Sequence, residues 1–371
     1  MREKRTLRLA TRGSDLALRQ AVAVQKGLEN RRTAVELVEV ETTGDELKDE
    51  LIHRLGKTGA FVRALDEQVL DGECDAAVHS MKDVPTDFPA ELVVAGVPQR
   101  AAAGDVLLTP EGRSLAELPE GAVVGTASLR RTAELLAERP DLTVEPLRGN
   151  VDTRVEKLLA PSLQAEHERR MEADEAASSG EDDAANAEQF DEDVEAWFDA
   201  LSEIERRALG REVDTEYDAI VLAEAGLERA GLLPHVPHER LPVETFVPAP
   251  GQGAIAVTAR DGDLAEDMRE QLDDPRTRVE TTVERTVLET LGGGCVAPLG
   301  VHATLRGEYV HVVARALSRD GTEEVRATAD LPVAEHPSTA RTFAERMADD
   351  GAAELVARAR VQEDEEREAT R

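Results

Sequence analysis

Arginine side chains cluster directly after strand-like stretches of the sequence. The first turn of a helix offers free N–H groups and a positive dipole end, and a guanidinium adds bidentate recognition of a carboxylate. Cations in that turn oppose the dipole, so they are poor choices for stability alone. The alternative is pairing with surface carboxylates, but the repetition favours a site for a ligand with several carboxylates or phosphates. The residues are Arg12, Arg130, Arg131, Arg148 and Arg154.

A second candidate lies in residues 79–85, His-Ser-Met-Lys-Asp-Val-Pro, just past a strand-like stretch. The carboxylate of Asp83 beside Lys82 stays ionised and is able to stabilise a cationic intermediate or accept an N–H from a substrate. The alternative is an ordinary loop in which this pair is surface decoration. Spacing alone does not separate the two.

The third candidate is Cys295, which follows three consecutive glycines. Glycines let the backbone bend tightly and expose the sulfur, so this cysteine is a candidate nucleophile or attachment point. No Cys/His spacing typical of zinc accompanies it, and no metal site is expected. Cys74, between Glu73 and Asp75, is expected to be structural, because neighbouring carboxylates disfavour a thiolate.

The first 260 residues alternate strand-like and helix-like stretches, which predicts parallel sheets with helices on both faces. Such sheets bind ligands at the carboxyl ends of their strands. A small α+β domain is expected from near 264–276 onward, with three close strands and one helix over about 339–358. The expected strands before it are 7–10, 35–42, 75–79, 92–97, 106–109, 123–126, 142–147 and 217–223, and the expected helices are 15–30, 60–70, 128–139 and 151–159.

The chain has 77 acidic and 44 basic residues, so its formal net charge is −33. This balance argues against nucleic acid or a membrane surface as a partner, because both require a dominant positive surface. No apolar run has the ~18 residues that a membrane span needs, and no signal peptide is evident. Two cysteines are too few for a disulfide framework. A cytoplasmic location is expected.

Only six of the basic residues are lysine. An acid-rich, lysine-poor surface resembles that of proteins from salt-accumulating cytoplasms. Self-repulsion at this charge is tolerable where molar salt shrinks the Debye length to ~3 Å. The alternative is an ordinary acidic protein with an acidic insertion.

Residues 161–216 form that insertion, with 19 acidic and five basic side chains. Residues 171–189 have a composition typical of disorder. Trp197, Leu201, Ile204 and Leu209 recur near helical spacing and predict a short amphipathic helix. A solvated surface insertion is expected; the alternatives are a docking helix for a partner or a flap over the active cleft.

Seven segments in order resemble the porphobilinogen deaminase (hydroxymethylbilane synthase) family. The segments HSMKDVP and SLRR are the most specific, and the resemblance covers nearly the whole chain outside 161–216. They are ATRGS at 10–14, VHSMKDVP at 78–85, VGTASLRR at 124–131, LRGNVDTR at 147–154, YDAI at 217–220, PGQGA at 250–254 and GGC at 293–295.

The resemblance implies a three-domain transferase that joins four porphobilinogen units head to tail into hydroxymethylbilane and releases ammonia. The chain grows on a dipyrromethane cofactor attached through a thioether, here to Cys295. It also implies two periplasmic-binding-protein-like, doubly wound α/β domains and a small C-terminal α+β domain. The expected boundaries are 1–100 with 241–263, then 101–240, then 264–371.

The resemblance also assigns residues. Asp83 matches the catalytic aspartate, whose carboxylate would bind pyrrole N–H groups and stabilise the azafulvene cation left when ammonia departs. The other matches are expected to bind the substrate or the cofactor. They are Arg12, Ser14, Asp45, Phe61, Ser80, Lys82, Thr126, Ser128, Arg130, Arg131, Arg148, Gly149, Asn150, Arg154, Arg229 and Gln252.

The expected partners are porphobilinogen and the growing oligopyrrole chain. The family implies a monomer that hands its product to the next enzyme of the pathway. The alternative function is a non-catalytic binder of small anions, which would need neither Asp83 nor Cys295.

Overall fold

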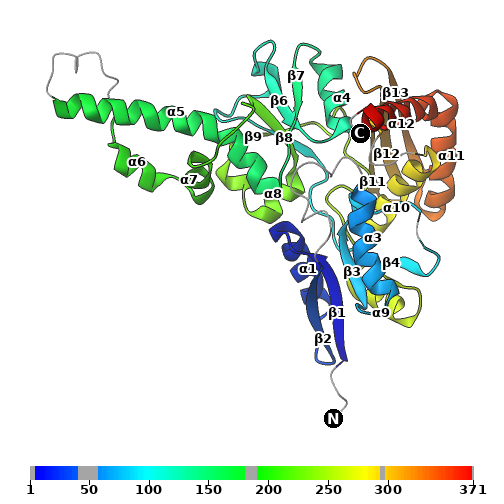
Figure 1. Ribbon diagram of the computed structural model, residues 1–371. Coiled ribbons are helices and arrows are strands. Elements are labelled where there is room, and N and C mark those ends of the chain that lie inside the picture. The colour runs from blue at the N-terminus through cyan, green and yellow to red at the C-terminus, as the bar shows by residue number, and fades with distance from the viewer. Residues whose placement is uncertain (1–4, 41–56, 88, 180–189, 293–296, 370–371) are drawn as a thin grey trace.

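The computed structural model describes residues 5–40, 57–87, 89–179, 190–292 and 297–369. They form two five-stranded sheets and a smaller three-stranded sheet (Figure 1). This arrangement confirms the expected fold class of two α/β units and a C-terminal α+β unit.

The first sheet has the strand order β2-β1-β3-β10-β4. Its β1, β2 and β3 run parallel, but β10 runs antiparallel to both of its neighbours, so the expected all-parallel sheet is wrong. The reason is that β10 comes from a distant part of the chain. The elements are β1 (Arg5–Arg12), α1 (Asp15–Leu28), β2 (Thr33–Val40), α3 (Lys57–Leu70), β3 (Ala76–Ser80), β4 (Leu92–Gly96), β10 (Ile255–Arg260) and α9 (Asp263–Leu272).

The second sheet repeats this plan with the order β7-β6-β8-β5-β9. Here β5 is the strand that runs antiparallel to its neighbours β8 and β9. Buried aliphatic side chains on both faces hold the helices to the sheet. The elements are β5 (Asp105–Leu108), β6 (Val123–Thr126), α4 (Leu129–Glu138), β7 (Thr143–Pro146), α5 (Val151–Ser179), β8 (Ala219–Ala223), α8 (Glu224–Ala230) and β9 (His238–Arg240).

The C-terminal sheet is an antiparallel meander covered by helices on one face. The single helix expected over 339–358 is two helices, because the chain turns at Gly351 with a φ of 106° that favours glycine. The elements are α10 (Pro275–Thr290), β11 (Leu299–Arg306), β12 (Tyr309–Leu317), β13 (Glu324–Pro332), α11 (His336–Asp349) and α12 (Ala352–Ala369).

The chain crosses between the two large sheets twice, over residues 97–104 and 241–254. The domain boundaries near 100 and 240 remain our proposal, and these crossings support it. Helix α9 packs into the core of the first sheet through Ala265, Met268 and Leu272. We therefore propose that the C-terminal domain begins near 274 rather than 264.

The insertion differs most from expectation. Helix α5 does not end near 159 but continues through Pro161 to Ser179. Residues 171–179, whose composition is typical of disorder, are therefore helical. The amphipathic stretch is two helices, α6 (Val194–Ala200) and α7 (Glu203–Leu209). Helix α7 is held to α5 by contacts that the sequence pattern does not indicate. The buried Glu156 of α5 forms ion pairs with Arg207 of α7 and with Arg211, which follows α7. These helices form an arm that projects away from the C-terminal unit (Figure 1).

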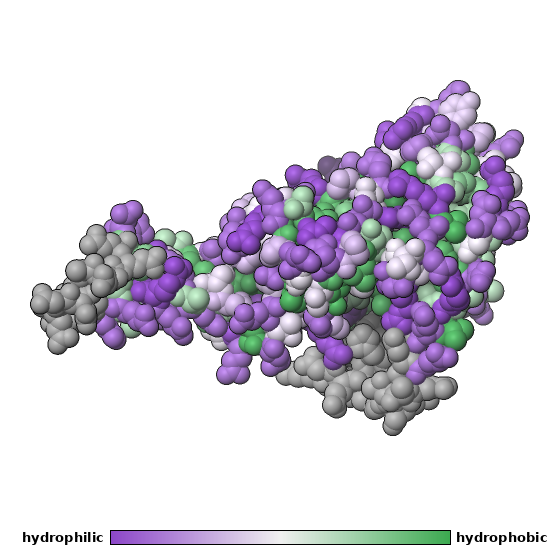
Figure 2. Space-filling model, turned by 90° about the horizontal axis from the view of Figure 1, so that it is seen from above, coloured by the Kyte–Doolittle hydropathy of each residue, from purple (hydrophilic) through white to green (hydrophobic). Residues whose placement is uncertain are grey.

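The surface is strongly hydrophilic over the face shown in Figure 2. With a net charge of −33, we expect the chain to unfold when molar salt is removed, because exposed charges then repel over a Debye length of about 10 Å or more. Circular dichroism in 3 M KCl and after dialysis into dilute buffer tests this prediction. Unchanged helical signal in dilute buffer would contradict it.

Candidate active site

The polar residues singled out in the sequence lie at the carboxyl ends of parallel strands. In the first sheet, Arg12 ends β1, and Ser80 ends β3. In the second sheet, the turns after β6 and β7 carry the remaining arginine segments, and Arg229 lies in α8 after β8. Lys82 interacts electrostatically with Arg131 and Arg154 of the second sheet. The two sets therefore lie near one another, and we expect a ligand between them, because open α/β sheets bind ligands at the carboxyl ends of their strands. The region between the two sets is called the cleft.

Asp83 sits in a fixed turn at this cleft. It ends a short 3-10 helix, η1 (Met81–Asp83), that directly follows β3. The backbone N–H of Met81 donates to the carbonyl of Ala254 at 3.0 Å, and that of Val84 donates to the carbonyl of Met81 at 3.1 Å. Burial lowers the pKa of Lys82, while the adjacent Asp83 opposes this shift. Lys82 is half-buried and interacts electrostatically with Asp83, Arg131 and Asp105, so the alternative of an ordinary surface loop is disfavoured.

Cations line the opposite side of the cleft. The Nε of Arg154 donates to the carbonyl of Gly149 at 2.7 Å, and Arg229 donates to the carbonyl of Gly253 at 2.6 Å. Burial, followed by the neighbouring Arg131, lowers the pKa of Arg154 to about 10. Burial also lowers the pKa of Arg229. A bound carboxylate would relieve the cost of burying these charges, and this favours an anionic ligand.

Ser14, Ser128 and Asn150 each have a local structural role, and their predicted contact with the ligand stays a prediction. Each side-chain oxygen accepts a backbone N–H in the first turn of a helix, at 3.4, 3.5 and 2.9 Å respectively. The three therefore cap α1, α4 and α5 at the cleft. Their helix starts present positive dipole ends toward the site. Thr126 is buried and accepts from the Ser128 backbone at 3.3 Å, whereas Arg148 and Gly149 are exposed.

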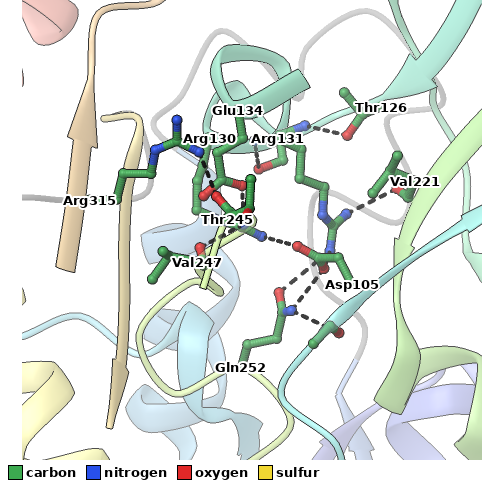
Figure 3. Close-up of polar contacts among 12 residues, drawn as sticks. Asp105, Thr126, Arg130, Arg131, Glu134, Val221, Thr245, Val247, Gln252 and Arg315 are labelled. Carbon is green, nitrogen blue, oxygen red and sulfur yellow. Dashed lines mark hydrogen bonds and ion pairs between the residues drawn. The ribbon is translucent and has the colours of Figure 1, made fainter. Parts of the chain in front are cut away.

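Two of the arginines are held in a buried network (Figure 3). Asp105, at the start of β5, accepts from Arg130 and from Arg131, each at 2.7 Å. Gln252 donates to the same carboxylate at 2.8 Å. Arg130 also donates to Glu134 at 2.7 Å. Pairing with carboxylates, the alternative weighed from the sequence, thus describes Arg130 and Arg131, although the partners are buried rather than on the surface.

The negative charge of this network is carried by Asp105. Burial alone would raise its pKa, but Arg130 and Arg131 outweigh burial and hold the pKa far below its usual range. Burial raises the pKa of Glu134 to about 8, with Arg130 only partly opposing it. Sequence reasoning did not identify either acid as part of the site. A carboxylate at the start of the apolar strand Asp-Val-Leu-Leu was the available signal.

Family comparison decides the class of protein. The model of "Porphobilinogen deaminase, dipyromethane cofactor binding domain" matches residues 7–166 and 202–268, and that of the "Porphobilinogen deaminase, C-terminal domain" matches 279–349. The chain belongs to the porphobilinogen deaminase family. Residues 167–201, which the first match leaves out, lie inside the acidic insertion.

Relatives agree over nearly the whole chain. A "probable porphobilinogen deaminase" of Halobacterium salinarum is 52% identical, with 96% of this chain and 98% of the relative covered. A "porphobilinogen deaminase" of Desulforudis audaxviator is 38% identical over 96% of this chain and 99% of its own. A solved periplasmic substrate-binding protein from Coxiella burnetii aligns with 72% of this chain and 92% of its own at 14% identity and a TM-score of 0.36.

Membership of the porphobilinogen deaminase family fixes the activity and the dipyrromethane cofactor. It favours the enzyme over a non-catalytic anion binder.

Three of the predicted site residues cannot be placed. Cys295 and Asp45 lie outside the described residues, as does the side chain of Phe61 in α3. Cys74 is buried, and burial raises the pKa of its thiol, as expected for a structural cysteine. Among the described residues, no group of acidic, histidine or cysteine side chains is arranged to hold a metal.

Proposed function

We propose that porphobilinogen molecules are joined in the cleft between the two large sheets, with Asp83 as the catalytic carboxylate. The observation that carries this proposal is the Lys82–Asp83 pair, fixed at the end of β3 and facing Arg131 and Arg154 of the second sheet. It places one carboxylate near several cations, of which Arg131 is buried and Lys82 and Arg154 are half-buried. A polycarboxylate with a developing positive charge needs both kinds of group.

The cations would bind the side chains of the substrate. Each porphobilinogen unit carries an acetate and a propionate, so four joined units carry eight carboxylates. Lys82, Arg154 and Arg229 have pKa values lowered by burial, and a carboxylate ligand would stabilise their charged forms. We infer that Arg12 and Arg148, which lie at neighbouring strand ends, extend this binding along the growing chain.

The same donor set fits the dipyrromethane cofactor, which carries carboxylates of the same kind. Ser80, Lys82 and Arg131 would hold them, and Cys295 would be the point of attachment. When bound, the cofactor supplies the pyrrole carbon to which the first substrate unit is joined. The Nε of Arg131 is buried without a hydrogen-bond partner among the described residues, which is consistent with an anionic ligand nearby.

Asp83 would act on the substrate in two ways. When ammonia leaves porphobilinogen, the C–N bond breaks and a pyrrole cation remains, which an adjacent carboxylate stabilises. The free ring carbon of the last pyrrole in the growing chain then forms a C–C bond to this cation and loses its proton. Asp83 would help to remove that proton.

We further infer a monomer in the cytoplasm that releases its product to the next enzyme of tetrapyrrole biosynthesis. The support is the family and the presence of only two cysteines. None of the helices in the described part of the chain has the length and hydrophobicity that a membrane span requires.

Arg154→Gln tests the binding role of the cleft cations. A charge-assisted hydrogen bond contributes about 1.5–3 kcal/mol, so we expect KM for porphobilinogen to rise at least about 10-fold, with a smaller change in kcat. Steady-state release of ammonia gives both constants. Arg358→Gln is the matched control, because Arg358 forms an exposed pair with Glu323 in the C-terminal unit. A KM for Arg154→Gln equal to that of the control would remove Arg154 from the binding site.

A further inference from the structure

Two adjacent residues of helix α10, Glu284 and Arg285, contact the crossings between the large sheets and the Asp83 turn. The first, Glu284, is fully buried. It accepts from both terminal nitrogens of Arg100, at 2.8 and 3.0 Å, and from the backbone N–H of Gly251 at 2.7 Å. Burial would raise the pKa of Glu284, but Arg100 and His302 lower it to about 2. Since Arg100 and Gly251 lie on the two crossings between the large sheets, Glu284 anchors α10 at both.

The second residue, Arg285, reaches the turn that carries Asp83. One terminal nitrogen donates to the carbonyl of Val84 at 2.8 Å, and the other donates to the carbonyl of Pro85 at 2.7 Å. These are the two residues that directly follow Asp83. Burial lowers the pKa of Arg285, so the guanidinium gives up hydration to make these contacts. A planar fork that donates to two consecutive carbonyls fixes the backbone direction there.

The other side of the turn is held by the segment that leads into β10. The N–H of Met81 donates to the carbonyl of Ala254. Gly251 packs so closely beneath Met81 that a Cβ at this position would lie 2.5 Å from the Met81 Cγ. Gly251 is also the residue whose N–H Glu284 accepts. The Asp83 turn is therefore held on one side by the segment before β10 and on the other by α10. Glu284 binds Gly251 on the first side, and Arg285 binds Val84 and Pro85 on the second.

We propose that Arg285 is a positioning residue that sets the location of the Asp83 carboxylate relative to the C-terminal unit. Helix α10 ends at Thr290, five positions before Cys295 in the sequence. One side chain thus couples the helix that precedes the attachment point to the turn that bears the catalytic group. This inference rests on the proposed roles of Asp83 and Cys295. A misplacement of about 1 Å can reduce a rate by 10²-fold.

Arg285→Gln tests the proposal, with Arg278→Gln as the matched control. Arg278 lies on the same helix and donates to the carbonyl of Val94 in β4 and to the carboxylate of Asp273, rather than to the carbonyls of Val84 and Pro85. We expect Arg285→Gln to lower kcat by about 10- to 100-fold with KM within about 3-fold of wild type and the cofactor mass retained. The control should keep kcat within about 2-fold, although both variants lose a contact between α10 and the first sheet.

Arg285→Lys serves as the second variant and should recover part of kcat, because an ammonium reaches one carbonyl but not both. A pocket lined by Arg285, Met81, Thr86 and Thr286 leaves room for water beside a shorter side chain. Folding of these variants is checked by circular dichroism. Wild-type kcat in Arg285→Lys overturns the proposal if Arg285→Gln does not fold.

A double-substitution cycle with Asp83→Asn separates positioning from general stability. If Arg285 acts through Asp83, then Arg285→Gln lowers the residual turnover of Asp83→Asn by less than about 2-fold. The same fold loss in both backgrounds, wild-type kcat in Arg285→Gln, or an equal loss in Arg278→Gln would overturn the proposal. Wild-type turnover in Asp83→Asn alone would instead refute the proposed function, so the two failures are distinguishable.

Discussion

Asp83→Asn is expected to lower turnover of porphobilinogen by about 10²- to 10⁴-fold while dipyrromethane remains attached. Asparagine has nearly the same shape as aspartate, so η1 and its hydrogen bonds to Ala254 and Val84 should persist. The substitution removes the negative charge that would stabilise the cation left by ammonia, and it removes the acceptor for a proton. Ammonia release measures turnover, and intact-protein mass reports the cofactor.

Asp87→Asn is the matched control, because Asp87 is an exposed carboxylate four residues further along the same loop. The turnover of Asp87→Asn should be within about 2-fold of wild type, because a substitution of an exposed residue changes stability little. Turnover of Asp83→Asn equal to that of Asp87→Asn would remove Asp83 from the mechanism. Loss of the cofactor from Asp83→Asn would instead assign Asp83 to cofactor assembly.

Asp105→Asn is expected to destabilise the fold by about 3–5 kcal/mol, because it leaves two buried guanidinium groups without their shared carboxylate. Arg130 and Arg131 are 4% and 5% exposed, so water cannot replace the lost partner without opening the structure. Denaturant unfolding at constant high salt measures the change in free energy. Turnover should also fall, because Arg131 faces Lys82 across the cleft.

The control for this prediction is Asp141→Asn, which removes a partly exposed pair with Arg139 in the same unit. A pair of that kind contributes about 0–1 kcal/mol.

The dependence of stability on acid pH should also differ between the wild type and Asp105→Asn. The pKa of Asp105 is held below its unfolded value near 3.9, so its stabilisation is present above that pH and is lost as the pH falls further. Equal destabilisation in Asp105→Asn and Asp141→Asn would contradict the role assigned to Asp105.

The sequence was most informative where local patterns decide structure. Apolar runs located most of the strands, and each arginine segment lay at the strand end where it was expected. Strand β9 (His-Glu-Arg) has no apolar run and was not predicted. The motif around Asp83 and the order of the segments indicated the family. These features depend on neighbours within a few residues, so they can be predicted without knowing the fold.

Pairings between distant residues could not be predicted in this way. Asp105 meets Arg130 and Arg131 only because β5 and α4 pack together, and the contact of Arg285 with Val84 spans 201 residues. The antiparallel directions of β5 and β10 also depend on how the chain crosses between sheets. Helix α5 continues beyond Pro161 although helix propensity predicts an end there. The contact between α5 and α7, which supports the longer helix, joins residues far apart in the sequence.

The most direct test of the account is the intact mass of the purified wild-type protein, with Cys295→Ser as the control. We predict that the wild type exceeds the mass of its polypeptide by one dipyrromethane and gives a colour with Ehrlich's reagent, and that Cys295→Ser has the bare mass and no turnover. A wild-type protein with the bare polypeptide mass and no activity on porphobilinogen would contradict the central claim.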